Sequence, residues 1–79
     1  MKTYIFKVEL EEEEGIWTAV VPALPGCNAW GHTEEEALTA IQENTKAYIE
    51  TLIEDNQPVP IEKKELEIPI QAPAVAVTI

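Results

Sequence analysis

Cys27 and His32 are the residues whose types most readily suggest chemistry, because a thiolate and an imidazole bind zinc or form a nucleophile and its base. They are the one cysteine and the one histidine of the 79-residue sequence. A structural zinc site needs four ligands, which this pair cannot supply. Their spacing alone does not indicate catalysis, and cysteine is among the most commonly buried residue types. We expect Cys27 to pack in the core and His32 to be a turn residue.

Two acidic clusters are the other candidates for chemistry, since hard divalent cations bind carboxylate oxygens. Neighbouring glutamates on a turn point in different directions, and glutamates in the first turn of a helix favour its dipole. We therefore interpret both clusters as solvated surfaces, and we expect no metal, no cofactor and no enzyme activity. The sequence also has no glycine-rich phosphate loop and no serine with a matching histidine and acid. The clusters are Glu11, Glu12, Glu13 and Glu14, and Glu34, Glu35 and Glu36.

Trp17 and Trp30 suggest binding rather than catalysis, because aromatic anchors dominate the energy of protein interfaces. Trp17 shares one side of an expected strand with Ala19 and Val21, and either side of that strand could face the core. If the Trp17 side is open, a protein partner would bind at the two tryptophans and the cluster Glu11 to Glu14. Packing of the rings in the core is the equal alternative.

The charge of the chain restricts the class of partner. There are 15 Asp and Glu residues against 5 basic residues, giving a formal net charge of -10. All the basic residues are lysines. Binding of DNA or RNA needs many cations to displace counterions, so we expect no direct nucleic-acid binding by this chain. A basic partner would be attracted instead.

One cysteine allows no internal disulfide, and the first residues lack the long apolar stretch of a signal peptide or membrane helix, so we expect a cytoplasmic protein without a membrane partner.

Alternation of apolar and polar residues predicts strands at about 3–10, 16–22, 27–31 and 65–70. The run Glu11 to Gly15 predicts a hairpin turn, and Pro22 ends the second strand because proline cannot donate to a ladder. Pro25 and Gly26 suit the two central positions of a type II turn. Pro69 gives the last strand the character of an edge strand. The apolar tail, 72–79, also shows strand spacing.

A helix is predicted over about 34–55. Thr33 and Glu36 form a capping box, in which the threonine hydroxyl accepts from the N3 amide. The apolar residues that follow recur at spacings of three and four, which indicates one packed stripe. Asn56 and Pro58 end the helix.

These elements predict a single α+β domain over 1–79, with the order β-β-β-α-β. It is a two-layer sandwich in which an antiparallel three-stranded meander and a fourth strand carry one long helix. So short a chain has a thin core, so we expect a dimer or tetramer. The expected self-association surface combines the end of the helix with the tail. Its residues are Ile49, Leu52, Ile53, Val75, Val77 and Ile79.

The turn and the start of the helix carry a resemblance to a known family. The segment from Pro22 through Leu24, Pro25, Gly26 and Cys27, followed by Gly31, Thr33 and Glu36, resembles the signature of HicB antitoxins. This resemblance covers residues 1 to about 70 and implies a reduced RNase H-type fold. It also implies a partner, the small basic HicA toxin, which cleaves mRNA. Full HicB proteins commonly carry a C-terminal DNA-binding module, which we do not expect here, and Ala23 stands where the family often has aspartate.

The leading hypothesis is therefore an antitoxin that binds and masks a HicA-type toxin. An orphan homo-oligomeric scaffold, or a small-ligand-binding module with no toxin partner, is the alternative. A metal-dependent nuclease is a third reading, which the sequence does not favour because no set of converging acidic residues is evident.

Overall fold

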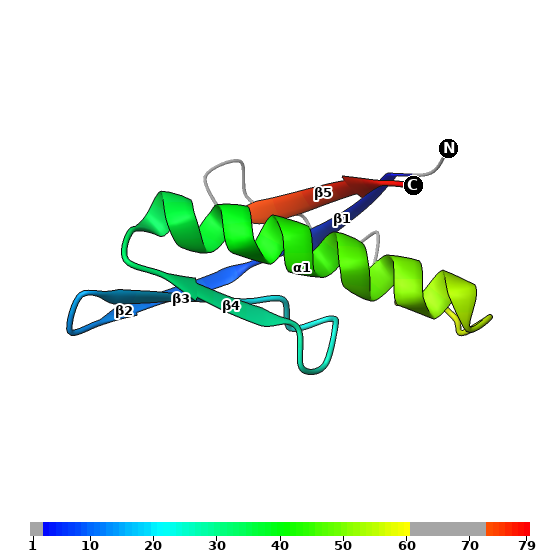
Figure 1. The fold of residues 1–79 in the computed structure, drawn as a ribbon, viewed down its shortest axis with the longest axis horizontal. Helices are drawn as coiled ribbons and strands as arrows, with labels where there is room; N and C mark the ends of the chain where they lie inside the picture. The colour runs from blue at the N-terminus through cyan, green and yellow to red at the C-terminus, as the bar shows by residue number, and fades with distance from the viewer. Residues whose placement is uncertain (1–2, 61–72) are drawn as a thin grey trace.

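The computed structural model describes residues 3–60 and 73–79, which form five strands and one helix. The helix α1 lies across one side of the strands, so the molecule has two layers (Figure 1). This is an α+β arrangement with antiparallel strands, as predicted. The elements are β1 (Thr3–Lys7), β2 (Glu9–Glu13), β3 (Ile16–Val20), β4 (Asn28–Gly31), α1 (Glu34–Glu54) and β5 (Ala74–Thr78).

The strands divide into two small sheets. One has the order β2-β3-β4 and is the predicted three-stranded meander, and the other pairs β1 with β5. The strand expected at 3–10 is therefore two strands, separated at Val8, whose N–H donates to the carbonyl of Pro73 at 3.0 Å. Tyr4, Phe6, Val8 and Leu10 still point to the same, more buried side, so the predicted alternation holds across the break.

The first hairpin turn is tighter than the sequence suggested. We expected the turn to occupy Glu11 to Gly15, but β2 continues to Glu13 and pairs with Ile16 of β3. The turn itself is Glu14 and Gly15, with φ of 52° and 83°. Positive φ at both central residues is what a two-residue type I′ turn requires, because its twist matches the flanking strands. The second and third strands are also shorter than expected, ending at Val20 and starting at Asn28.

The strand after the helix comes from the tail. The strand predicted at 65–70 lies outside the described residues, whereas β5 falls in the segment 72–79 that was predicted to be an apolar tail. It pairs with β1 along its whole length, from Lys7 opposite Ala74 to Thr3 opposite Thr78. The two ends of the described chain therefore lie side by side (Figure 1).

The helix starts and ends much as predicted. The Thr33 hydroxyl accepts from the Glu36 N–H at 3.0 Å, and the Glu36 carboxylate reaches back to accept from the His32 N–H at 3.0 Å. The last helical residue is Glu54, one before the predicted end, and Asn56 takes the left-handed conformation with φ of 56°. Loss of the regular helix at this point is expected, since a left-handed residue terminates the intrahelical ladder.

The core lies between α1 and the two sheets. The helix contributes a stripe at every fourth position, namely Ala37, Ile41, Thr45 and Ile49. The strands and loops contribute Phe6, Val8, Ala19, Val21, Leu24, Cys27, Ala29, Val75 and Val77.

Three of the six residues expected to form the self-association surface are buried in the structure. Ile49, Val75 and Val77 are at most 3% exposed within one copy of the chain, so placing them on an open surface was wrong. They are buried because β5 packs under the helix instead of remaining a free tail. Leu52 and Ile79 are half-buried and Ile53 is 43% exposed. Self-association through these three residues stays a prediction.

Candidate functional site

The loop between β3 and β4 is a closed structure held by three backbone hydrogen bonds. Leu24 accepts from the Cys27 N–H at 2.9 Å across Pro25 and Gly26, and Gly26 has φ of 80°. This is the predicted type II turn, in which glycine supplies the positive φ. Val21 both accepts from the Leu24 N–H at 3.0 Å and donates to the Cys27 carbonyl at 3.1 Å.

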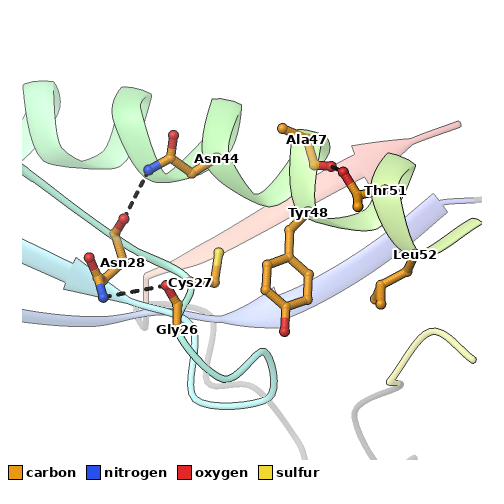
Figure 2. Close-up of a pocket in the computed structure, with 8 residues that line it drawn as sticks. All are labelled: Gly26, Cys27, Asn28, Asn44, Ala47, Tyr48, Thr51 and Leu52. Carbon is orange, nitrogen blue, oxygen red and sulfur yellow. Dashed lines mark hydrogen bonds between the residues drawn. The ribbon is translucent and has the colours of Figure 1, made fainter. Parts of the chain in front are cut away.

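Two side chains of α1 hold this loop in place through hydrogen bonds to its backbone. The Tyr48 hydroxyl donates to the Pro25 carbonyl at 2.9 Å, and the Asn44 side chain donates to the Asn28 carbonyl at 2.9 Å. Figure 2 shows Asn44 pointing from α1 toward Asn28. Sequence reasoning missed both contacts, because no local pattern tells which polar residue of a helix lies over a loop.

Cys27 has a packing role, as expected. It is 4% exposed, and its Sγ lies 3.6 Å from the hydroxyl of Thr45, which donates to the Ile41 carbonyl at 2.6 Å. A thiol buried against a helix cannot attack a substrate in solution. His32 is an exposed turn residue, and its ring meets that of Trp30 edge to face with centroids 5.4 Å apart.

A shallow pocket of about 360 Å³ lies between the loop and the second half of the helix (Figure 2). Its lining has no ionisable group besides the Cys27 thiol and the Tyr48 phenol, so it has no means of holding a charged ligand by ion pairing. The lining residues are Gly26, Cys27, Asn28, Asn44, Ala47, Tyr48, Thr51 and Leu52.

Gly31 allows the helix to start close to β4. A Cβ added there would lie 2.6 Å from Glu36 Cβ and 2.7 Å from the Ala37 backbone nitrogen, which is closer than real contacts allow. The spacing Gly31, Thr33, Glu36 therefore has a structural reason: the glycine admits the first helical turn, and the other two residues cap it.

The side of the β2-β3-β4 sheet away from α1 is exposed, and we call it the open face. Opposed residues of antiparallel strands point to the same side, so the register defines its members. We call the residues that one strand contributes to this face its column. The column of β2 consists of glutamates, the column of β3 consists of β-branched residues, and the column of β4 consists of Asn28 and Trp30. The residues are Glu9, Glu11, Glu13, Ile16, Thr18, Val20, Asn28 and Trp30, and all are exposed.

The structure separates the two tryptophans. Trp17 is opposite Glu12 and Gly31, on the side of the sheet that faces α1, and it packs half-buried against the core. Trp30 is on the open face and is 60% exposed. The register therefore resolves the alternative that the sequence left open for Trp17, in favour of packing on the helix side.

The four glutamates of the first cluster are also divided. Glu11 and Glu13 are on the open face, together with Glu9, which the sequence analysis did not single out. Glu12 has the other orientation, and its carboxylate accepts from the Gly15 N–H at 2.8 Å. Glu14 is in the turn. Alternation would have identified Glu9, Glu11 and Glu13 as one column if the strand had been extended through the acidic run.

A hollow of about 300 Å³ lies on the open face, lined by Glu9, Leu10, Glu11, Thr18 and Val20. Its lining brings two glutamates of the open face next to Val20, a combination suited to the side chain of a lysine or arginine, whose stem is apolar and whose head is cationic.

Residues 3–60 and 73–79 are the part of the chain that the structure describes. No group of three His, Cys, Asp or Glu side chains in this part is placed to hold a metal ion. No helix there is long and apolar enough to cross a membrane.

Comparison with known proteins identifies the family. The model of the HicB-like antitoxins of bacterial toxin–antitoxin systems matches residues 4–79. The chain belongs to the HicB-like antitoxin family. A UPF0150 protein of Thermoplasma acidophilum is 44% identical to it over 62 residues, covering 78% of this chain and 88% of that protein. A UPF0150 protein of Synechocystis is 47% identical over 60 residues, covering 75% and 76%.

Solved HicB structures share the fold of this HicB-like chain. The N-terminal domain of the Burkholderia pseudomallei antitoxin HicB superposes with a TM-score of 0.64 at 24% identity, covering 99% of this chain and 98% of that domain. A chain of the HicA3 and HicB3 toxin–antitoxin complex superposes with a TM-score of 0.63 at 17% identity, covering 94% and 95%. Against the longer B. pseudomallei HicB structure, at 25% identity and a TM-score of 0.62, this chain spans 64% of the length.

Proposed function

We propose that this HicB-like chain neutralises a small basic toxin of the HicA type by binding over the surface with which the toxin holds RNA. The observation that carries the proposal is the family match over residues 4–79. A HicA3 and HicB3 toxin–antitoxin complex is among the structures that share the fold. Masking in the cytoplasm, without any chemical step, is the proposed mechanism.

The surface charge supports a basic partner. Every acidic side chain in the described part of the chain is exposed, and the net charge of the whole chain is -10. Such a surface raises the rate at which a cationic protein associates with it. Its carboxylates also compete with RNA phosphates for the lysine and arginine side chains of that protein. The same surface disfavours RNA as a direct ligand of this chain.

The test is a ribonuclease assay with the protein encoded by the reading frame adjacent to the gene of this chain. Messenger RNA is incubated with that protein alone and with increasing amounts of the chain, and intact RNA is followed over time. We expect cleavage to stop at a fixed molar ratio, because masking is stoichiometric. Cleavage that continues at a large excess of the chain would contradict the proposal.

A second assay separates masking from degradation of the toxin. After inhibition, the complex is adjusted to high salt, where ion pairs at a surface are screened. Recovery of ribonuclease activity on dilution into fresh substrate is expected, because the toxin is covered and not altered. Permanent loss of activity would indicate an enzymatic action of this chain.

A further inference from the structure

The open face combines, on one exposed surface, the features by which a cationic protein is recognised. Its β2 column has three carboxylates on alternate residues, which places neighbouring ones about 7 Å apart along the strand. No basic residue belongs to the columns of this face. A negative surface of this kind is complementary to lysine and arginine side chains presented at similar spacing.

Apolar groups lie next to the carboxylates. Ile16 and Val20 are each 37% exposed, and Trp30 is 60% exposed. Glu11, Thr18 and Trp30 form one row across the sheet, because Thr18 is opposite both of the others. Two strand spacings place the Glu11 and Trp30 columns about 10 Å apart. One partner element can therefore contact the carboxylates and the indole together.

We propose that the open face is where the toxin docks, with a lysine or arginine of the toxin in the hollow between Glu9 and Glu11 and a second cation over the ring of Trp30. This rests on the proposed function, since the occupant is the toxin. Glu9 and Glu11, which line the hollow, supply two carboxylates for the first cation, and Val20, which lines it too, supplies an apolar side chain for the stem. The indole of Trp30, which is 60% exposed, attracts the second, because tryptophan is the most favourable aromatic residue for contact with a cation.

The opposite side of the molecule provides a matched control. Glu43, Glu50 and Glu54 are exposed on α1, which covers the other side of the sheet. Changing them to glutamine removes the same three charges as changing Glu9, Glu11 and Glu13. The two triple variants therefore have the same net charge and differ in which face has lost it.

The experiment is calorimetry at low salt with the protein encoded by the reading frame adjacent to the gene of this chain. We expect E9Q/E11Q/E13Q to weaken binding by at least about 30-fold and E43Q/E50Q/E54Q by less than about 3-fold, because docked charges contribute more than distant ones. Trp30→Ala is expected to weaken binding by about 30-fold or more, as truncation of a central aromatic anchor does. Equal weakening by both triple variants would overturn the docking site and leave the proposed function standing. Absence of binding by the unaltered chain would overturn both.

A second measurement uses the unaltered chain, so that its result does not depend on whether the variants fold. The indole N–H signals of Trp17 and Trp30 are recorded by NMR as the toxin is added. The Trp30 signal should move or broaden and the Trp17 signal should stay, because Trp17 packs on the helix side. A response of Trp17 alone would contradict the proposal.

Discussion

The hydroxyl of Tyr48 donates a 2.9 Å hydrogen bond to the carbonyl of Pro25, and so joins the second half of α1 to the turn that carries the family resemblance. The two residues are 23 positions apart in the sequence. Together with Asn44 over Asn28, this contact fixes where β4 begins. The position of β4 in turn places Trp30 on the open face, so the loop contributes to the proposed binding surface without belonging to it.

Tyr48→Phe should loosen the loop without unfolding the protein. Loss of one neutral hydrogen bond costs about 0.5–1.5 kcal/mol. We expect faster hydrogen exchange at the amide of Cys27, which closes the turn, and little change at Val77 in β5. Tyr4→Phe is the control, because Tyr4 lies in β1. Similar exchange at Cys27 in the two variants would show that the contact does not hold the loop.

The helix stripe should account for much of the stability. Ile41 is 0% exposed and Ile53 is 43% exposed, so the same substitution can be compared at a buried and an exposed site of one helix. Ile41→Ala is expected to lower the free energy of unfolding by about 2–5 kcal/mol, through lost burial and the cavity left behind. Ile53→Ala should cost less than about 1 kcal/mol in the monomer. Urea denaturation at low protein concentration measures both.

The same pair also tests self-association. If the exposed end of the helix joins two copies, Ile53→Ala should shift sedimentation toward the monomer. An unchanged distribution would exclude Ile53 from any such contact.

Gly31→Ala should be destabilising by about 1–3 kcal/mol, because the added methyl overpacks the start of the helix. The Cβ would lie within 2.7 Å of the Ala37 backbone nitrogen, which cannot move without the helix. Trp30→Ala, one residue earlier, should stay within about 1 kcal/mol of the original stability, since its ring lies outside the core. Thermal unfolding followed by circular dichroism compares the two. A Gly31→Ala protein as stable as the original would mean that the close approach of helix and strand is not needed.

The tryptophans should respond differently to a quencher. Trp17→Phe leaves Trp30 as the single indole, and Trp30→Phe leaves Trp17. Acrylamide should quench the Trp30 fluorescence of the first variant more strongly, and its emission should lie further to the red, because that ring is 60% exposed. Comparable quenching in both would contradict the assignment of the two sides of the sheet.

Local patterns predicted the elements well but not their partners. The capping box at Thr33 and the Pro25–Gly26 turn were predictable because both depend on residues close in sequence. The break at Val8 was not, since it depends on a hydrogen bond to Pro73, far along the chain. The pairing of β5 with β1 is equally non-local, which is why Val75 and Val77 were expected on a surface.

The sequence predicted which residue types form the candidate site, but it did not predict which side of the sheet each residue faces. The sequence indicated tryptophan and glutamate as the binding residue types, and the family resemblance was confirmed. The orientation of Trp17 required the strand register, because either side of an isolated strand satisfies the same alternation. The column of Glu9, Glu11 and Glu13 was missed because Glu9 was assigned to the first strand, whereas the acidic run after it was interpreted as a turn, where side chains share no common face.

The central claim is that this chain binds a basic toxin through its negative surface. Titration of the unaltered chain into the protein encoded by the adjacent reading frame, repeated at 50, 150 and 500 mM salt (roughly a threefold range of screening length), measures it directly. We expect a saturable complex whose dissociation constant rises by about tenfold or more across the series, while the stoichiometry stays constant. No heat of binding at the lowest salt, or an affinity independent of salt, would contradict the account.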